Sequence, residues 1–298
     1  MKANEFLKEV MESEYKSDDF PQIYSEFQKF QSDILNTLTE FHRVCELNNI
    51  NYELAFGSLL GLIRDGGQIP WDYDIDVIVA FEDKERLIKA LQKDLSNKHY
   101  FYCPDVNKRC RHMIMRVSPI EYRTEAIHVD VFFMIGTPED EEERRKFAQR
   151  ITKLSRDRYG KLVNLKEEAL GNYRRFISIF LKRKLPTLFC SIRKINQEYE
   201  KLCSQYSSKT ASYCISADTF ASWRDYPTSL LWETKVVEAD YGEIRIPVHF
   251  EELLSLIYGD YKKIPPLEKR IQEVRYNHLR IKQYEGKPRI VKIGRAHV

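Results

Sequence analysis

The segment GSLLGLIRDGGQIPWDYDIDV, residues 57–77, constrains the fold of this chain more than any other. It joins a Gly-Ser pair, a Gly-Gly pair and the closely spaced Asp72, Asp74 and Asp76 to the apolar residues of DIDVIVAF. That apolar run predicts a buried strand. Asp74 and Asp76 stand at positions i and i+2, so their side chains leave the same face of the strand. Two carboxylates on one face repel each other unless a cation lies between them.

The segments around this strand alternate between strand and helix patterns. Apolar residues recur at helical spacing from Phe27 to Cys45 and predict an amphipathic helix. YELAF then reads as a strand, SLLGLIR as a short helix, EDKERLIKALQKDL as a helix, and RHMIMRVS and IHVDVFFMI as strands. We therefore expect an α/β (α+β) fold, with a mixed sheet flanked by helices and followed by a helical insertion.

Changes in composition divide the chain into five segments. The expected segments are an amino-terminal helical part (1–24), the catalytic core (25–137), a basic helical region (138–215), a carboxy-terminal part that packs on the core (216–285) and a tail (286–298). Within YGEIRIPVHFEELLSLIYGDYKKIPP we expect a strand, a proline turn and a helix that ends at Gly259.

The carboxylates predict a hard divalent cation. Oxygen ligands favour Mg²⁺ or Mn²⁺, and substrate phosphates commonly complete such sites. Asp130 lies at the centre of the apolar HVDVFF, where an unpaired charge is costly, and it joins Asp74 and Asp76 if the two strands are neighbours. The alternative is structural: Asp72 and Asp74 cap a turn and a helix, and Asp130 pairs with an arginine.

A phosphate site is expected just upstream of the aspartates. A strand, a Gly-Ser pair and a short helix let backbone N–H groups and Ser58 hold phosphate oxygens next to Gly57. A phosphate cradle followed by a metal-binding pair is the arrangement of a nucleotidyltransferase active site. It favours metal-assisted phosphoryl chemistry over a purely structural role.

These motifs resemble those of the LicD family, which includes bacterial phosphocholine transferases and the fukutin-related proteins. GSLLGLIRDGGQIPWDYDIDV is similar to the family signature, HVDVFF to its third-carboxylate strand, and IRIPVHFEELLSLIYGDYKKIPP to its carboxy-terminal motif. The matches lie in order over residues 50–266. The usual family pattern has an acidic residue where this chain has Tyr73.

The resemblance implies a nucleotidyltransferase-like fold and a set of site residues. Asp74, Asp76 and Asp130 would hold one or two Mg²⁺ (or Mn²⁺) ions against the pyrophosphate of a CDP-activated donor. The remaining expected donor contacts are Gly57 and Ser58 in the phosphate cradle and Arg64 as a neutralising charge.

Four further residues have two readings each. Trp71 either offers an aromatic face to a quaternary ammonium or is a buried core residue, and Asp72 is the candidate general base. Arg116 either contacts donor phosphate or pairs with Asp130 or Glu121. His128 shares the face of Asp130 on a regular strand, where it either supports the site or is a core histidine.

The carboxy-terminal motif also leaves two readings. Lys262 and Lys263 either approach the donor or acceptor or complement the end of the helix before Gly259.

Composition sets the remaining expectations. The net charge of +3 does not favour a nucleic-acid partner, and six scattered cysteines without a CxxC pair are typical of reduced thiols. The amino terminus lacks the apolar core of a signal peptide, so we expect a cytoplasmic protein, at most peripheral at the inner face of the cell membrane. Residues 173–194 mix apolar and basic side chains. They suit either an anionic membrane surface or a solvated basic face over a buried stripe.

The leading hypothesis is a phosphotransferase that moves a phospho-alcohol, phosphocholine above all, from a CDP-activated donor to a hydroxyl of a glycan precursor of lipopolysaccharide or teichoic acid, with release of CMP. Phosphoethanolamine, glycerol phosphate and ribitol phosphate satisfy the same chemistry. A nucleotidyltransferase that releases pyrophosphate is the other enzyme class, and a non-catalytic nucleotide-binding scaffold is the alternative outside enzymes.

Overall fold

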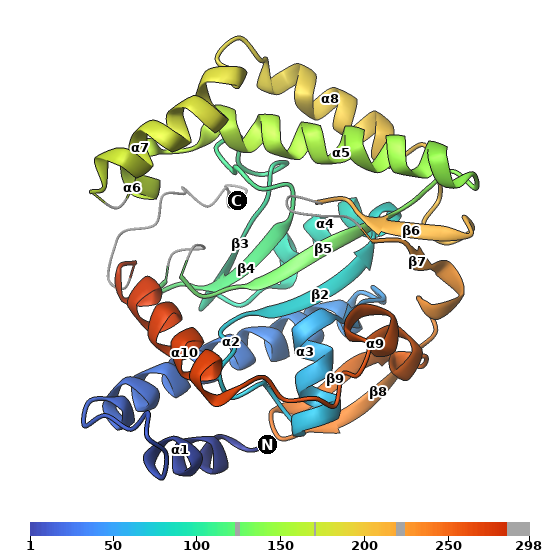
Figure 1. Cartoon of the computed structure of the whole chain (residues 1–298). Coiled ribbons are helices and arrows are strands. Elements are labelled where there is room, and N and C mark those ends of the chain that lie inside the picture. The colour runs from blue at the N-terminus through green and yellow to red at the C-terminus, as the bar shows by residue number, and fades with distance from the viewer. Residues whose placement is uncertain (123–125, 170, 219–223, 285–298) are drawn as a thin grey trace.

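The computed structural model describes residues 1–122, 126–169, 171–218 and 224–284, and within them the chain forms a mixed sheet flanked by helices (Figure 1). Five strands follow the order β1-β2-β5-β4-β3, and β6 and β7 extend the sheet beside the second half of β5. Only β2 and β5 are parallel among these described pairs. The strands are β1 (Glu53–Leu54), β2 (Ile75–Ala80), β3 (His99–Tyr102), β4 (Met115–Pro119), β5 (Val129–Gly136), β6 (Tyr213–Ser216) and β7 (Tyr226–Pro227), with a separate hairpin of β8 (Thr234–Ala239) and β9 (Gly242–Pro247). The expected α/β class is confirmed.

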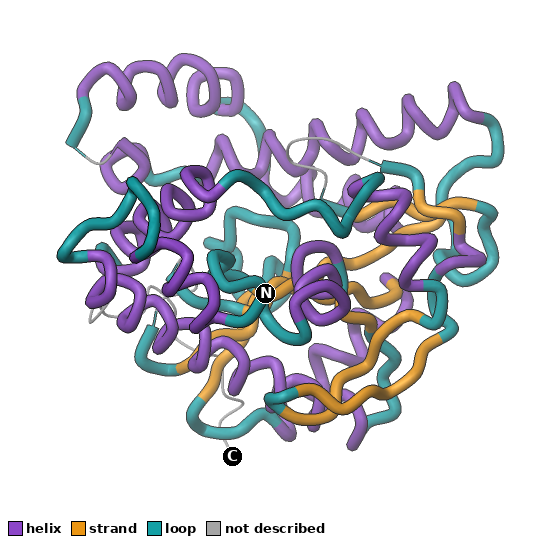
Figure 2. Tube along the Cα trace, turned by 60° about the horizontal axis from the view of Figure 1, so that its bottom comes forward, coloured by secondary structure: helices purple, strands orange, loops and turns teal. Residues whose placement is uncertain are grey.

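Helices cover the sheet from both sides. Figure 1 shows α5 and α8 above it and α2, α3 and the β8–β9 hairpin below, and the turned view in Figure 2 shows the strands between these helical layers. The α-helices are α1 (Ala3–Met11), α2 (Phe20–Leu47), α3 (Phe56–Leu60), α4 (Lys84–Asp94), α5 (Glu141–Leu162), α6 (Leu165–Ala169), α7 (Tyr173–Ile179), α8 (Ile192–Cys203), α9 (Phe250–Tyr258) and α10 (Leu267–Lys282). A single buried cluster joins residues from Phe6 in α1 to Ile281 in α10.

A sharp turn links β1 to α3 and begins the signature segment. Phe56 adopts a left-handed φ of +47°, which costs a non-glycine residue on the order of 1–2 kcal/mol. Its ring packs edge-on against Phe132 of β5, with 5.4 Å between ring centroids, and this contact holds the residue in place. The turn therefore directs α3 back across the start of β2, where the aspartates lie.

Most expected elements are present. The helix expected from Phe27 to Cys45 is confirmed as part of α2, which begins earlier, at Phe20, so the expected boundary between residues 24 and 25 falls inside a helix. The strand expected over RHMIMRVS begins only at Met115. The helix that ends at Gly259 is confirmed, and Gly259 has the left-handed φ of +66° that favours glycine. The expected tail, 286–298, lies outside the described residues.

No helix in the described ranges is long and apolar enough to cross a membrane.

Candidate active site

Four aspartates meet where β2 and β5 begin. Asp76 of β2 and Asp130 of β5 are directly opposite each other on neighbouring parallel strands, which meets the condition under which Asp130 was expected to join Asp74 and Asp76. Burial raises the pKa of Asp76 well above its usual value, and the charges of Asp74 and Asp130 raise it further. Burial and the adjacent Asp72 carboxylate do the same to Asp74. Concentrated negative charge of this kind binds either protons or cations.

The signature segment holds these carboxylates in place. The Asp76 backbone N–H donates to Ser58 Oγ at 2.8 Å, which ties α3 to the start of β2. Gln31 of α2 donates to the Asp72 carbonyl oxygen at 2.7 Å, and the Tyr73 N–H donates to Asp72 Oδ1 at 2.9 Å. Ser58 is thus placed as a support of Asp76, and its expected phosphate contact stays a prediction.

The absence of a side chain at Gly57 leaves room for the Asp72 carboxylate. A Cβ added at Gly57 would lie 3.0 Å from Asp72 Oδ2, closer than nearly all real Cβ contacts. Asp72 shares a side-chain hydrogen bond with Asp74, and burial raises its pKa. A raised pKa makes Asp72 a stronger proton acceptor than an ordinary carboxylate, which suits its expected role as a base.

Asp130 is in a different electrostatic state from its neighbours. Its Oδ1 accepts a hydrogen bond from Arg116 Nε of β4 at 2.8 Å and lies 3.4 Å from His128 Nε2. Burial alone would raise the pKa of Asp130, but the Arg116 guanidinium and the His128 imidazole more than offset burial and lower it. Of the two readings of Arg116, the structure shows the ion pair with Asp130. His128 is buried and supports the same carboxylate.

The carboxylates do not already form a complete metal cage. Within the described residues, no group of three or more His, Cys, Asp or Glu side chains is arranged to hold a metal ion. Asp130 is turned to Arg116, which leaves Asp74 and Asp76, with Asp72 beside them, as the oxygen donors that fit a hard cation. The metal assignment of Asp74, Asp76 and Asp130 stays a prediction.

Trp71 and Arg64 both contact other side chains of the protein. The Trp71 ring is buried, and its centroid lies 5.4 Å from that of the Phe6 ring. The guanidinium groups of Arg270 and Arg64 lie over the Trp71 ring, 5.1 and 5.7 Å from its centroid. Arg64 pairs with Asp65 at 2.8 Å. The structure thus places Trp71 in the core, according to the second of its two readings, while substrate binding by Arg64 stays a prediction.

Sequence reasoning missed three groups around the carboxylates. Burial raises the pKa of Tyr258, at the end of α9, and the negative charges of Asp76 and Asp72 raise it further. Arg280 of α10 donates to the Tyr73 hydroxyl at 2.6 Å. The family signature pointed to the motif that contains Tyr258 but singled out its lysines, and Lys262 and Lys263 are exposed.

The third missed group is Asp218, which follows β6. Its Oδ2 accepts a hydrogen bond from the Met113 N–H at 3.1 Å, and burial raises its pKa to about 6. The charges of Arg116 and Asp130 also act on it, so Asp218 belongs to the same electrostatic group. No motif marks it, because it is brought there by the pairing of β6 with β5.

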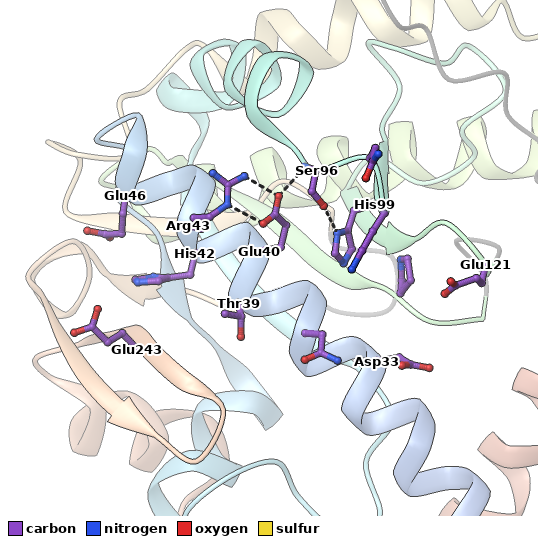
Figure 3. Close-up of a pocket in the computed structure, with 14 residues that line it drawn as sticks. Asp33, Thr39, Glu40, His42, Arg43, Glu46, Ser96, His99, Glu121 and Glu243 are labelled. Atoms are coloured by element: carbon purple, nitrogen blue, oxygen red, sulfur yellow. Dashed lines mark hydrogen bonds and ion pairs between the residues drawn. The ribbon is translucent and has the colours of Figure 1, made fainter.

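A separate open cleft lies beside α2, with a volume of about 990 Å³. Figure 3 shows its lining, in which Glu40 is bonded to Arg43 and to Ser96. Its acidic side chains are Asp33, Glu40, Glu46, Glu121 and Glu243. None of the site residues expected from the sequence lines it, and so many carboxylates disfavour a polyphosphate there.

A family model and a relative both match the part of the chain that contains the aspartates. Residues 49–162 match the family model described as LicD/FKTN/FKRP, nucleotidyltransferase domain. The chain is also 24% identical over 249 residues to the lipopolysaccharide cholinephosphotransferase LicD of Haemophilus influenzae, across 78% of this chain and 90% of that relative. These matches confirm the resemblance: residues 49–162 are similar to the LicD-type nucleotidyltransferase domain, and the relative that matches most of the chain is a cholinephosphotransferase.

Proposed function

We propose that this protein is a phosphotransferase that moves phosphocholine from CDP-choline to a hydroxyl of a lipopolysaccharide glycan precursor. The observation that carries the proposal is the group of Asp72, Asp74 and Asp76 facing Asp130 across β2 and β5, within a LicD-type domain. The homologous cholinephosphotransferase supports the choline donor and the lipopolysaccharide acceptor. Teichoic acid precursors are the other acceptor class with the same chemistry.

The proposed reaction exchanges one phosphate ester for another. The acceptor oxygen forms a bond to the phosphorus that carries choline, and the bond from this phosphorus to the CMP oxygen breaks. The acceptor loses its proton to Asp72, and CMP leaves with the electron pair of the broken bond. A divalent cation, Mg²⁺ or Mn²⁺, held by Asp74 and Asp76 would neutralise the negative charge on the donor pyrophosphate.

Contacts within the chain hold the carboxylates and Arg116 in fixed positions for this reaction. Asp76 is fixed by the rigid β2 strand and by Ser58 Oγ, and Asp72 is fixed by its contacts with Gln31 and Tyr73. Arg116 lies within the group as a fixed positive charge beside Asp130. Rigid placement of this kind lowers the reorganisation needed during phosphoryl transfer.

Two alternatives use the same site. The donor alcohol is ethanolamine, glycerol or ribitol in the first, because the phosphate chemistry does not depend on the alcohol. In the second, the protein is a nucleotidyltransferase. The two reaction classes differ in the released product, since the phosphotransferase releases CMP and the nucleotidyltransferase releases pyrophosphate.

The test incubates the purified chain and Mg²⁺ with CDP-choline and a lipopolysaccharide precursor, and separates the nucleotide products. We expect CMP release that needs both the precursor and the metal and that is lost on chelation. Asp74→Asn and Asp76→Asn should abolish it, whereas the exposed Asp240→Asn should not. Pyrophosphate in place of CMP, or equal activity in the Asp74 and Asp76 variants, would refute the proposal.

A further inference from the structure

The helical hairpin, which comprises α6, α7 and the turns up to the start of α8 (residues 165–169 and 171–194), exposes apolar side chains. In the segment of α7 and the turns that follow it, Tyr173, Leu181 and Phe189 are 75, 53 and 101% exposed. The exposed stripe consists of Tyr173, Ile177, Leu181, Leu185, Leu188 and Phe189. No residue of α7 is buried. Of the two readings of residues 173–194, the stripe buried beneath a basic face does not hold for these six side chains, because they face outward.

Basic side chains surround this stripe. Between Glu168 and Glu198 the sequence has seven Lys or Arg and no Asp or Glu, although the whole chain carries a net charge of only +3. The basic residues are Arg174, Arg175, Lys182, Arg183, Lys184, Arg193 and Lys194. In the described part of the chain, no ion pair to a carboxylate is formed by Arg174, Arg175 or Lys182. Apolar surface and concentrated positive charge are thus combined on one exposed element.

The hairpin and the preceding helix α5 contact the loop before β4. Arg111 pairs with Glu168 of α6 at 3.0 Å, and the His112 ring lies 5.3 Å from the Tyr159 ring of α5. Burial lowers the pKa of His112, and so does the charge of Arg116, which also pairs with Asp130. In Figure 1, α6 and α7 lie on the side of the molecule from which β2 and β5 begin.

We propose that residues 173–194 dock this protein on an anionic lipid bilayer surface. Exposed Leu and Phe enter the boundary between headgroups and acyl chains, and the surrounding Arg and Lys bind lipid phosphates. A soluble polyanion would satisfy the charges and leave the apolar stripe in water, so the combination favours a bilayer. The site would then face an acceptor that is held at the membrane. The inference concerns binding and stands independently of the proposed reaction.

The experiment is co-sedimentation of the full chain with phosphatidylethanolamine vesicles that contain phosphatidylglycerol, and with phosphatidylcholine vesicles alone. We expect tight binding to the anionic vesicles only, weakened by salt. Leu181→Ser with Phe189→Ser should reduce the affinity about tenfold or more. Arg174→Gln with Arg175→Gln should reduce it about fivefold per charge. These side chains are exposed, so unchanged thermal unfolding should confirm that both pairs fold.

Matched controls change exposed residues of the same kinds elsewhere on the chain. Leu47→Ser with Tyr15→Ser, and Lys8→Gln with Lys146→Gln, should leave vesicle binding unchanged. Equal binding to neutral vesicles, or full binding by both hairpin variants, would overturn the proposal. A dimer in vesicle-free buffer that the Leu181 and Phe189 pair converts to a monomer would also overturn it, because a second copy would then cover the stripe.

Discussion

Asp76→Asn and Asp130→Asn should each remove activity. The two substitutions should change the free energy of unfolding in opposite directions. Asp76 lies among carboxylates that raise its pKa, so Asp76→Asn removes a repelled charge and should stabilise the metal-free fold. Asp130 is held by Arg116 and His128, which lower its pKa, so Asp130→Asn removes a favourable partner and should destabilise the fold. The two residues are opposite one another on adjacent strands, which makes them a matched pair.

The magnitude follows from the strand pairing. Neighbouring strands lie about 4.8 Å apart. Two carboxylates about 5 Å apart repel by about 3 kcal/mol at an effective dielectric constant of about 20. Arg116 offsets part of this repulsion, so Asp76→Asn should raise the free energy of unfolding by about 1–2 kcal/mol, or about 2–6 °C in Tm. Asp130→Asn relieves the same repulsion but removes the carboxylate that Arg116 contacts, a loss of about 3–5 kcal/mol for a buried ion pair, so it should lower the free energy of unfolding by about 1–3 kcal/mol.

The pH dependence gives the same contrast. The pKa values of Asp74 and Asp76 are raised in the folded state, so their contribution to stability is fully present below about pH 3.9 and is lost as the pH rises through the raised values. The pKa of Asp130 is lowered. Its contribution is present above about pH 3.9 and is lost as the pH falls through its folded-state value.

The assay is thermal unfolding in chelator near neutral pH, repeated with Mg²⁺. Mg²⁺ should stabilise the unsubstituted chain and have little effect on Asp76→Asn, while Asp240→Asn on the surface should behave as the unsubstituted chain. If Asp76→Asn and Asp130→Asn shift Tm in the same direction, the electrostatic description of the site is wrong.

Three other substitutions and conditions test separate parts of the structure. Gly57→Ala should lower activity by about tenfold or more without unfolding the chain, because the new Cβ displaces the Asp72 carboxylate. Steady-state kinetics would measure the activity and circular dichroism would show that the variant is folded. Full activity would contradict the prediction. Glu9→Ala should lower the free energy of unfolding by about 1–2 kcal/mol, because it removes the carboxylate that Arg270 contacts at 2.6 Å, and the 38% exposure of Glu9 lets solvent screen the pair. Denaturant unfolding would measure the change, and one under about 0.5 kcal/mol would count against it. Mn²⁺ affinity should fall as the pH is lowered, because protons compete with the metal for the Asp74 carboxylate, whose pKa is raised. Calorimetric titration at several pH values would measure this affinity. Binding that does not depend on pH would exclude Asp74 as a ligand.

Local patterns predicted the elements that carry the site. The i, i+2 spacing of Asp74 and Asp76 and the apolar runs of β2 and β5 predicted two strands whose carboxylates meet if the strands are neighbours. The register of Asp76 against Asp130 shows that the strands are neighbours. Helical spacing predicted α2, and Gly259 predicted the end of α9. These signals are local, so they are read directly from the sequence.

Contacts between distant segments could not be predicted in the same way. The short strand β6 pairs with β5, which lies about 80 residues earlier in the sequence, and β7 pairs with β6. Asp218 reaches the site only through the pairing of β6 with β5. Trp71 looked equally suited to a cation pocket or a core, and only its packing against Phe6 and Arg270 separates the readings. The exposure of Leu181 likewise depends on how the hairpin packs, which periodicity alone does not determine.

The fate of each half of the donor tests the central claim most directly. CDP-choline labelled in choline and, separately, in cytidine would be incubated with the protein, Mg²⁺ and the lipopolysaccharide precursor, and the label followed into the glycan. The proposed mechanism predicts that choline enters the glycan with its phosphorus and that cytidine leaves as CMP. Cytidine in the glycan, or no transfer of choline by a chain that binds CDP-choline, would contradict it.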